Sequence, residues 1–343
     1  FANLVNYCLG VGILSFPWSF AGASILGGLA IIAIGTAWCA VTNIMMVTLA
    51  DRMQEYNLGM LLKKLPSGII LEPFGNAMLL VCNILCLVGY LVVFADTFEK
   101  LVSRAILGYS LAGITWVRPL LVGLGCLIMF PLSFLDQSRL AFTSTVSIGA
   151  NWFIFLLLIW EAVSASELPT VCVVGLGVGD FTMLAVVMMG VSIQQCVLPV
   201  YEEMQNRSVT QFVKIQVKAA VVVFILLAGV SVAGYVRYGS DVPSNILLAL
   251  PSTAVGLLAQ AAILPVVIGI YPLLLYPVTI AIKGFVAAPR NHGQEHLLDM
   301  DGDGSPGSHQ SRVLLIILQI AVVVFTGLIA STGIDLGPIN NFT

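Results

Sequence analysis

Charged residues are scarce in this chain. Only 9% of its 343 residues are Asp, Glu, Lys or Arg, whereas 59% are hydrophobic, and the mean hydropathy is +1.03. A soluble domain normally carries about 25% charged residues, so the composition excludes an ordinary soluble fold. The net charge is only −3 and no block of like charge occurs, which argues against nucleic acid as a partner.

Residues that would build a metal centre, a disulfide framework or a catalytic site are also few. The three histidines all fall in the polar segment 284–311, and the seven cysteines are scattered without metal-ligand spacing. We therefore expect no metal, no cofactor and no enzyme activity. In the same segment, 299–304 resembles the start of an EF-hand, but Gln310 stands where the loop requires glutamate. An acidic flexible loop is the better interpretation.

Long apolar segments dominate the remaining sequence. A helix needs about 20 residues to cross the hydrocarbon core of a bilayer, and polar residues separate the segments of this length. We expect membrane helices at 3–21, 25–50, 74–98, 117–135, 140–163, 181–204, 215–237, 252–283 and 311–332. The sequence therefore predicts an all-α integral membrane protein, multi-pass in the lipid bilayer, with one transmembrane domain over 1–343.

The distribution of lysine and arginine predicts the orientation of these helices. If the chain starts on the cytosolic side, ten of the 14 basic residues lie in inside loops, as the positive-inside rule favours. We therefore expect a cytosolic N-terminus and a cytosolic polar loop at 284–311. The short amphipathic segment 57–73 is expected to form an interfacial helix on the cytosolic surface.

Two of the expected membrane helices contain residues that interrupt helices. The first carries "GVGILSFP" at 10–17, and the sixth carries "GVSIQQCVLP" at 190–199. Interrupted helices at corresponding positions of two halves indicate the midplane site of a transporter. In lipid, the freed N–H and C=O groups are tolerated only where protein, water or a ligand satisfies them. We expect non-helical backbone at about Leu9 to Ile13 and at about Ser192 to Val197.

The freed backbone groups suit a zwitterionic ligand. N–H groups that open the second half-helix favour a carboxylate, and carbonyls on both segments favour an ammonium group or a cation. Adjacent sites for an anion and a cation match an α-amino acid. For Gln194 and Gln195, a structural hydrogen bond is the alternative interpretation. The residues expected to line the substrate site are Gly10, Val11, Gly12, Ile13, Leu14, Ser192, Gln194, Gln195 and Cys196.

These stretches resemble the amino acid/auxin permease family, and within it the sodium-coupled neutral and vacuolar amino acid transporter branches. "NLVNYCLGVGILSFPWSFAGA" at 3–23 is similar to the first helix of that family, and "VLPVYEEM" at 197–204 to its sixth. The resemblance implies a LeuT-like bundle of eleven helices in two inverted repeats, of which about nine are present here. The first repeat would cover about 1–163 and the second, incomplete, about 181–332.

The resemblance also implies a function. The protein would be a secondary active transporter, a symporter that moves small neutral amino acids by alternating access along a proton or sodium gradient. It would lie in the plasma membrane or in a vacuolar or lysosomal membrane. The alternative is an amino acid sensor of transporter fold that acts through a protein partner. The resemblance assigns Asn6 to the region that binds substrate and sodium, although a hydrogen bond between helices would also explain this residue.

Asn6, Asp96 and Glu203 are the candidates for ion coupling. Asp96 falls near the outer end of the third expected helix, where a solvated helix end is an equally good interpretation and Lys100, four residues on, could form an ion pair with it. Glu203 matches the motif of the sixth helix, and both gating and a solvated helix end are open for it.

The eighth expected helix bears on the identity of the ion. In the sodium-coupled branch a threonine on this helix completes the sodium site, but Ile268 and Ile270 occupy the matching positions here. Sodium prefers oxygen ligands, which an isoleucine side chain does not supply. The sequence therefore predicts transport that depends on pH rather than on sodium.

Overall fold

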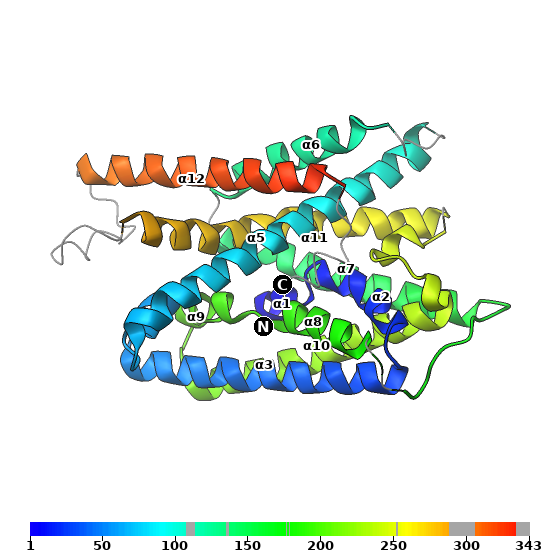
Figure 1. Ribbon diagram of the computed structural model, residues 1–343, viewed down its shortest axis with the longest axis horizontal. Helices are drawn as coiled ribbons and strands as arrows, with labels where there is room; N and C mark the ends of the chain where they lie inside the picture. The colour runs from blue at the N-terminus through cyan, green and yellow to red at the C-terminus, as the bar shows by residue number, and fades with distance from the viewer. Residues whose placement is uncertain are drawn as a thin grey trace.

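The structure is a computed structural model that describes residues 1–107, 114–134, 137–175, 177, 179–251, 253–287 and 306–333. Within these residues the chain forms helices and no strand. The long helices lie side by side in one elongated bundle (Figure 1). Helices α6 and α12 lie along one edge of this view, α3 lies along the opposite edge, and α5 runs obliquely between them.

Seven helical segments of the described chain are long and apolar enough to cross a membrane, and two shorter apolar helices accompany them. Together they match the nine segments expected from the sequence, so the prediction of an all-α membrane protein is confirmed. In chain order they are α1 (Ala2–Leu9) with η1 (Gly12–Ser15) and α2 (Phe16–Ala21), α3 (Ile25–Met53), α5 (Gly68–Leu101), α6 (Val117–Leu132), α7 (Gln137–Val163), α8 (Gly179–Val191) with α9 (Gln194–Glu202), α10 (Val209–Tyr238), α11 (Ala254–Ala287) and α12 (Pro306–Ser331).

Helix α3 shows how a helix that is apolar on all sides is divided between lipid and protein. Ile34, Trp38 and Met45 form an outward stripe and are each more than 60% exposed. Cys39, Asn43 and Val47 lie on the other side and are buried. The buried stripe therefore contains the polar Asn43 and Cys39 side chains, and the exposed stripe offers mostly apolar surface to lipid.

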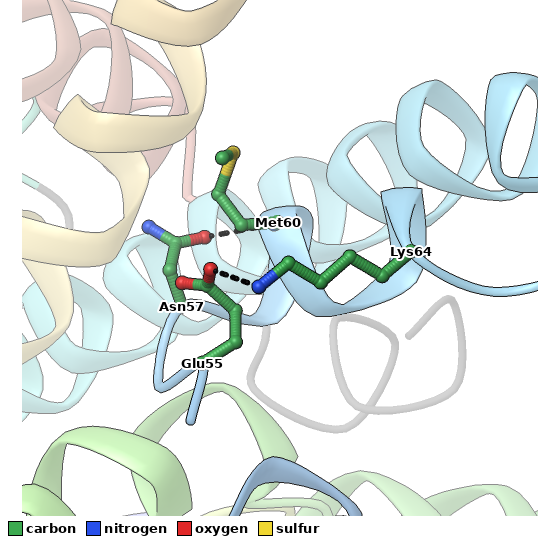
Figure 2. Close-up of polar contacts among 4 residues, drawn as sticks. All are labelled: Glu55, Asn57, Met60 and Lys64. Carbon is green, nitrogen blue, oxygen red and sulfur yellow. Dashed lines mark hydrogen bonds and ion pairs between the residues drawn. The ribbon is translucent and has the colours of Figure 1, made fainter. Parts of the chain in front are cut away.

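The segment 57–73 does not form the single interfacial helix that we expected. Helix α4 covers only Leu58–Lys63, and Asn57 caps its N-terminus by accepting a hydrogen bond from the Met60 N–H on its Oδ1 at 3.2 Å (Figure 2). After α4, the Lys64 Nζ reaches back to a Glu55 carboxylate oxygen at 2.9 Å. Pro66 then disfavours helical backbone at the residue before it, and the rest of the segment, from Gly68 onward, is the start of α5.

The polar loop expected at 284–311 is shorter than predicted. Helix α11 continues to Ala287 and α12 begins at Pro306. The residues between them, including the stretch 299–304 that resembles an EF-hand, lie outside the described residues.

Candidate substrate and ion site

The first membrane segment is interrupted where the sequence predicts. Helix α1 ends at Leu9, and Gly10 takes φ 43° and ψ −144° before a 3₁₀ turn leads into α2. This left-handed φ favours glycine, which has no Cβ to collide with the backbone. Ser15 precedes α2 but does not cap it with its side chain; its Oγ donates instead to the Gly12 carbonyl at 2.9 Å.

The second interruption is also confirmed in position, but it is shorter than predicted. Only Ser192 and Ile193 separate α8 from α9, and the helix resumes at Gln194 rather than after Val197. The backbone turns back into a helix at once because the Cys196 N–H donates to the Ile193 carbonyl at 2.8 Å.

Side chains of α3 hold the second interruption in place. The Cys39 Sγ lies 2.6 Å from the Val191 carbonyl, at the end of α8. The Gln194 Nε2, at the start of α9, donates to the Thr42 Oγ1 at 3.4 Å. This contact supports the structural interpretation of Gln194. The role of α3 was not expected from the sequence, although Thr42 and Asn43 stand out as polar residues within an apolar segment.

Both interruptions leave backbone groups without hydrogen bonds. At the first, the Asn6 carbonyl accepts from the Gly10 N–H at 2.9 Å, but the next three carbonyls, at 7–9, accept no backbone hydrogen bond from the described residues. The N–H groups of Gly12 and Ile13 donate none in that part of the chain. At the second interruption, the carbonyls of Gly190 and Ser192 accept no backbone hydrogen bond from the described residues. The N–H groups at 194–195 donate none to the described residues either.

The two interruptions face each other through glycine. A Cβ added to Gly12 would lie 4.0 Å from the Gly190 Cα. Neither glycine carries a side chain, so the two interrupted backbones approach each other closely here. One ligand there could present an anionic group to N–H groups and a cationic group to carbonyls.

Tyr90 of α5 borders the first interruption. A Cβ on Gly10 would collide with the Tyr90 hydroxyl, and the Val11 N–H interacts with the same oxygen. Tyr90 is buried, so its hydroxyl limits the space beside the interruption. Tyr90 is the only tyrosine in the third expected helix, which is the one feature of the sequence that singles it out.

Most of the other expected site residues are buried near these backbones, and Ser192 is exposed. Asn6 is 2% exposed, and its Nδ2 donates to the Ser144 Oγ of α7 at 3.3 Å. The hydrogen bond between helices that we considered for Asn6 is therefore present. Its Oδ1 has no partner among the described residues. The residues that are buried are Val11, Ile13, Leu14 and Cys196, and those that are partly buried are Gly12, Gln194 and Gln195.

Asp96 is paired with Arg118 of α6. The two side chains meet at 2.9 Å, and the Arg118 Nε donates further to the Ala330 carbonyl of α12 at 3.3 Å. Lys100, which we considered as the partner of Asp96, donates to three carbonyls at 3.0, 2.8 and 3.0 Å. These belong to Leu247, Leu248 and Leu250. The Asp96–Arg118 pair joins α5, α6 and α12. None of these helices contains either interruption.

Replacing Asp96 with asparagine is therefore expected to affect stability more than transport. The variant would leave Arg118 without its charged partner in a half-buried position, which should lower the free energy of unfolding by about 1–3 kcal/mol. Amino acid uptake per folded molecule should stay within about threefold of the original protein. Thermal unfolding and uptake in proteoliposomes would measure the two effects. A loss of uptake in fully folded protein would instead make Asp96 part of the coupling mechanism.

Glu203 directly follows α9 and is exposed. Although the side chain is exposed, the protein around it still removes part of its hydration, and this desolvation, and then the neighbouring charge of Glu202, raise the pKa of the Glu203 carboxyl above its usual value. At about 1.5 Å per helical residue, the length of α9 places Glu203 more than about 10 Å from the second interruption. A proton bound there would therefore act on substrate only through a conformational change.

A small cavity lies beside the second interruption. Its volume is about 10 Å³, which is enough for one water molecule and too small for an amino acid. It is lined by Leu4, Cys8, Thr36, Cys39, Val191, Gln216, Ala219, Ala220 and Val223.

Comparisons with known proteins identify the relatives of this chain. A family model described as transmembrane amino acid transporter protein matches residues 1–343. The amino acid transporter AVT1J of Arabidopsis thaliana is 28% identical over 272 residues, which cover 72% of this chain and 58% of that protein. Solute carrier family 38 member 8 of Mus musculus is 22% identical over 290 residues, which cover 80% of this chain and 65% of the mouse protein. The chain thus spans less than two thirds of the length of these relatives.

A vacuolar relative and a solved structure complete the comparison. Vacuolar amino acid transporter 2 of Saccharomyces cerevisiae is 26% identical over 272 residues, which cover 74% of this chain and 54% of the yeast protein. The fold matches that of Mhp1, a nucleobase-cation-symport-1 family transporter, with a TM-score of 0.66 and 12% identity over 99% of this chain and 73% of Mhp1. This likeness shows a LeuT-like fold, and the relatives are transporters rather than enzymes. The chain belongs to the transmembrane amino acid transporter family.

Proposed function

We propose that this protein is a symporter that moves small neutral amino acids across a membrane by alternating access. The observation that carries the proposal is the facing pair of interruptions at Gly12 and Gly190, where backbone groups on both sides make no backbone hydrogen bond within the described residues. The names of the plant and yeast relatives describe amino acid transporters, which supports the same substrate class.

The unpaired groups assign a role to each end of the substrate. The N–H groups of Gly12 and Ile13 open the second half of the first segment, where the positive end of the helix dipole favours the α-carboxylate. The carbonyls at 7–9 and at Gly190 favour the α-ammonium group. Tyr90 and Phe16 restrict the remaining space, because a Cβ on Gly190 would lie 2.9 Å from the Phe16 ring. A small side chain fits this space better than a large one.

The placement in the cell follows the family and the charge distribution. The protein is a multi-pass membrane protein, and we assign it to the plasma membrane or to a vacuolar or lysosomal membrane with the N-terminus in the cytosol. The two interrupted segments correspond if 1–163 and 181–332 are inverted repeats, and alternating access would then be a movement of one repeat against the other around the site.

Amino acid binding to the purified full chain tests the proposal directly. L-alanine should raise the melting temperature, because a ligand that binds only the folded state stabilises it. Ethylamine and propionate, which each keep one of the two charged groups, should have little effect at the same concentration. In proteoliposomes, radiolabelled alanine should accumulate and unlabelled neutral amino acids should compete. A melting temperature that no amino acid changes, together with absent uptake, would refute the proposal.

A further inference from the structure

A short helical turn between α10 and α11 depends on side chains for its hydrogen bonds. This turn, η4, covers Ile246–Leu248. Asn245 caps its N-terminus, because the Asn245 Oδ1 accepts from the Leu247 N–H at 3.2 Å. A turn of this length has no residues of its own to pair with the carbonyls at its C-terminal end. Those carbonyls therefore need donors from elsewhere in the chain.

Lys100 supplies these donors from the last turn of α5. Its Nζ donates to the carbonyls of Leu247, Leu248 and Leu250 at 3.0, 2.8 and 3.0 Å. An ammonium group has three N–H bonds, so all of them are used here, and the charge makes each hydrogen bond stronger than one between neutral groups. Gln260 of α11 is fully buried and also donates to the Leu247 carbonyl, at 3.1 Å. Two helices therefore hold the same turn, and Lys100 makes most of the contacts.

The turn lies against the first interruption. It contacts η1 (Gly12–Ser15), the 3₁₀ turn that follows the break in the first membrane segment. Ile246 is fully buried. A Cβ added to Gly234 would lie 3.5 Å from the Ile246 Cδ1 and 2.7 Å from the Pro17 Cβ. Ile246 thus packs beside the start of α2, and η4 covers the interruption on this side.

We propose that Lys100 positions η4 over the first interruption and thereby keeps a bound amino acid in its site. Lys100 acts through the turn that it caps, so it is a positioning residue. The inference rests on the proposed transport function and adds the residue that closes the site on this side. If Lys100 served only to solvate its own charge at the end of α5, its loss would leave the first interruption unchanged.

Hydrogen–deuterium exchange tests the clamp without reference to transport. In purified full-length Lys100→Met, the amides at 245–249 should exchange at least about tenfold faster than in the original protein, which corresponds to about 1.4 kcal/mol less opening free energy. The amides at 12–14 should also exchange faster, because the turn that covers them opens more often. Lys100→Arg keeps the charge and offers N–H donors, so it should exchange more slowly than Lys100→Met in both segments.

Two further variants control for the chemistry of the change and for the fold. Lys64→Met removes a lysine that pairs with Glu55 beside α4, and exchange at 12–14 and at 245–249 should match the original protein. Gln260→Leu removes one hydrogen bond to the Leu247 carbonyl and leaves Lys100 in place. It should raise exchange in both segments, by less than Lys100→Met does, and it supplies the test if Lys100→Met does not fold. Thermal unfolding checks the fold of every variant.

Release of bound alanine tests the consequence for the substrate. The original protein and each variant are loaded with radiolabelled L-alanine and then diluted into an excess of unlabelled alanine. Lys100→Met should release the label at least about tenfold faster than the original protein, and Lys64→Met should release it at the original rate.

The outcomes separate the clamp from the transport function. Unchanged exchange at 245–249 in both Lys100→Met and Gln260→Leu would overturn the clamp. Faster exchange at 245–249 with unchanged exchange at 12–14 would overturn the closure of the interruption. Faster exchange in both segments with an unchanged release of alanine would overturn the retention of substrate and leave the transport function intact. Faster exchange in both segments in a protein that binds no amino acid would uphold the clamp and refute the proposed function.

Discussion

Replacing Gly12 with valine is expected to abolish amino acid binding while the protein stays folded. The first added carbon would lie 4.0 Å from the Gly190 Cα, an ordinary contact that the fold tolerates. The two methyl groups beyond it would crowd the point where the two interrupted backbones approach, and the proposed substrate must reach both backbones at that point. We expect affinity for alanine to fall at least about 100-fold, which corresponds to about 2.7 kcal/mol.

Gly12→Ala provides the graded control for this experiment. It adds only the carbon that would lie 4.0 Å from the Gly190 Cα, so its melting temperature should match that of the original protein. Its affinity for alanine should lie between those of the original protein and of Gly12→Val. Isothermal titration with alanine measures the affinities, and thermal unfolding without ligand checks the fold. If Gly12→Val binds alanine normally, the substrate does not lie on this backbone and the site must be sought elsewhere in the bundle.

The helices could be predicted from the sequence because lipid imposes a length and a composition on each of them. The two interruptions could be predicted for the same reason, since glycine and proline in apolar segments stand out locally. Their extents could not be predicted in the same way. The second interruption is only Ser192 and Ile193 because α3 supplies Cys39 and Thr42 to its ends, and local sequence carries no information on such distant partners.

The surroundings of the site depend on contacts between segments far apart in the chain, and the sequence did not reveal them. Tyr90 lies against Gly10 although about 80 residues separate them in the sequence, and Ser144 contacts Asn6 across a separation of 138 residues. Asp96 has two cations within reach by sequence, and the nearer one, Lys100, is engaged by the carbonyls at 247–250. Helical spacing alone favours Lys100, whereas the packing of α6 against α5 brings Arg118 to Asp96.

Replacing Gly10 with alanine is expected to destabilise the protein strongly, by about 3 kcal/mol or more. Two effects add. Gly10 has φ 43° and ψ −144°, a conformation that is strained by about 1–3 kcal/mol for a residue with a side chain. The new Cβ would also collide with the Tyr90 hydroxyl. Gly149→Ala on α7 is the matched control, because nothing lies within 4 Å of the added carbon and alanine stabilises a helix interior by about 1 kcal/mol relative to glycine.

A double-mutant cycle with Tyr90→Phe separates the two effects. Tyr90→Phe alone should cost about 1–2 kcal/mol, because the Val11 N–H loses the oxygen it interacts with. In the Gly10→Ala background the same change should be favourable or neutral, because it removes the atom with which the new Cβ collides. We expect a coupling energy of at least about 1 kcal/mol, measured by reversible unfolding in mixed micelles. The backbone strain should persist in the double variant, since phenylalanine does not relieve it. If the two changes are additive, the Tyr90 hydroxyl does not lie against Gly10, and the description of this side of the site is wrong.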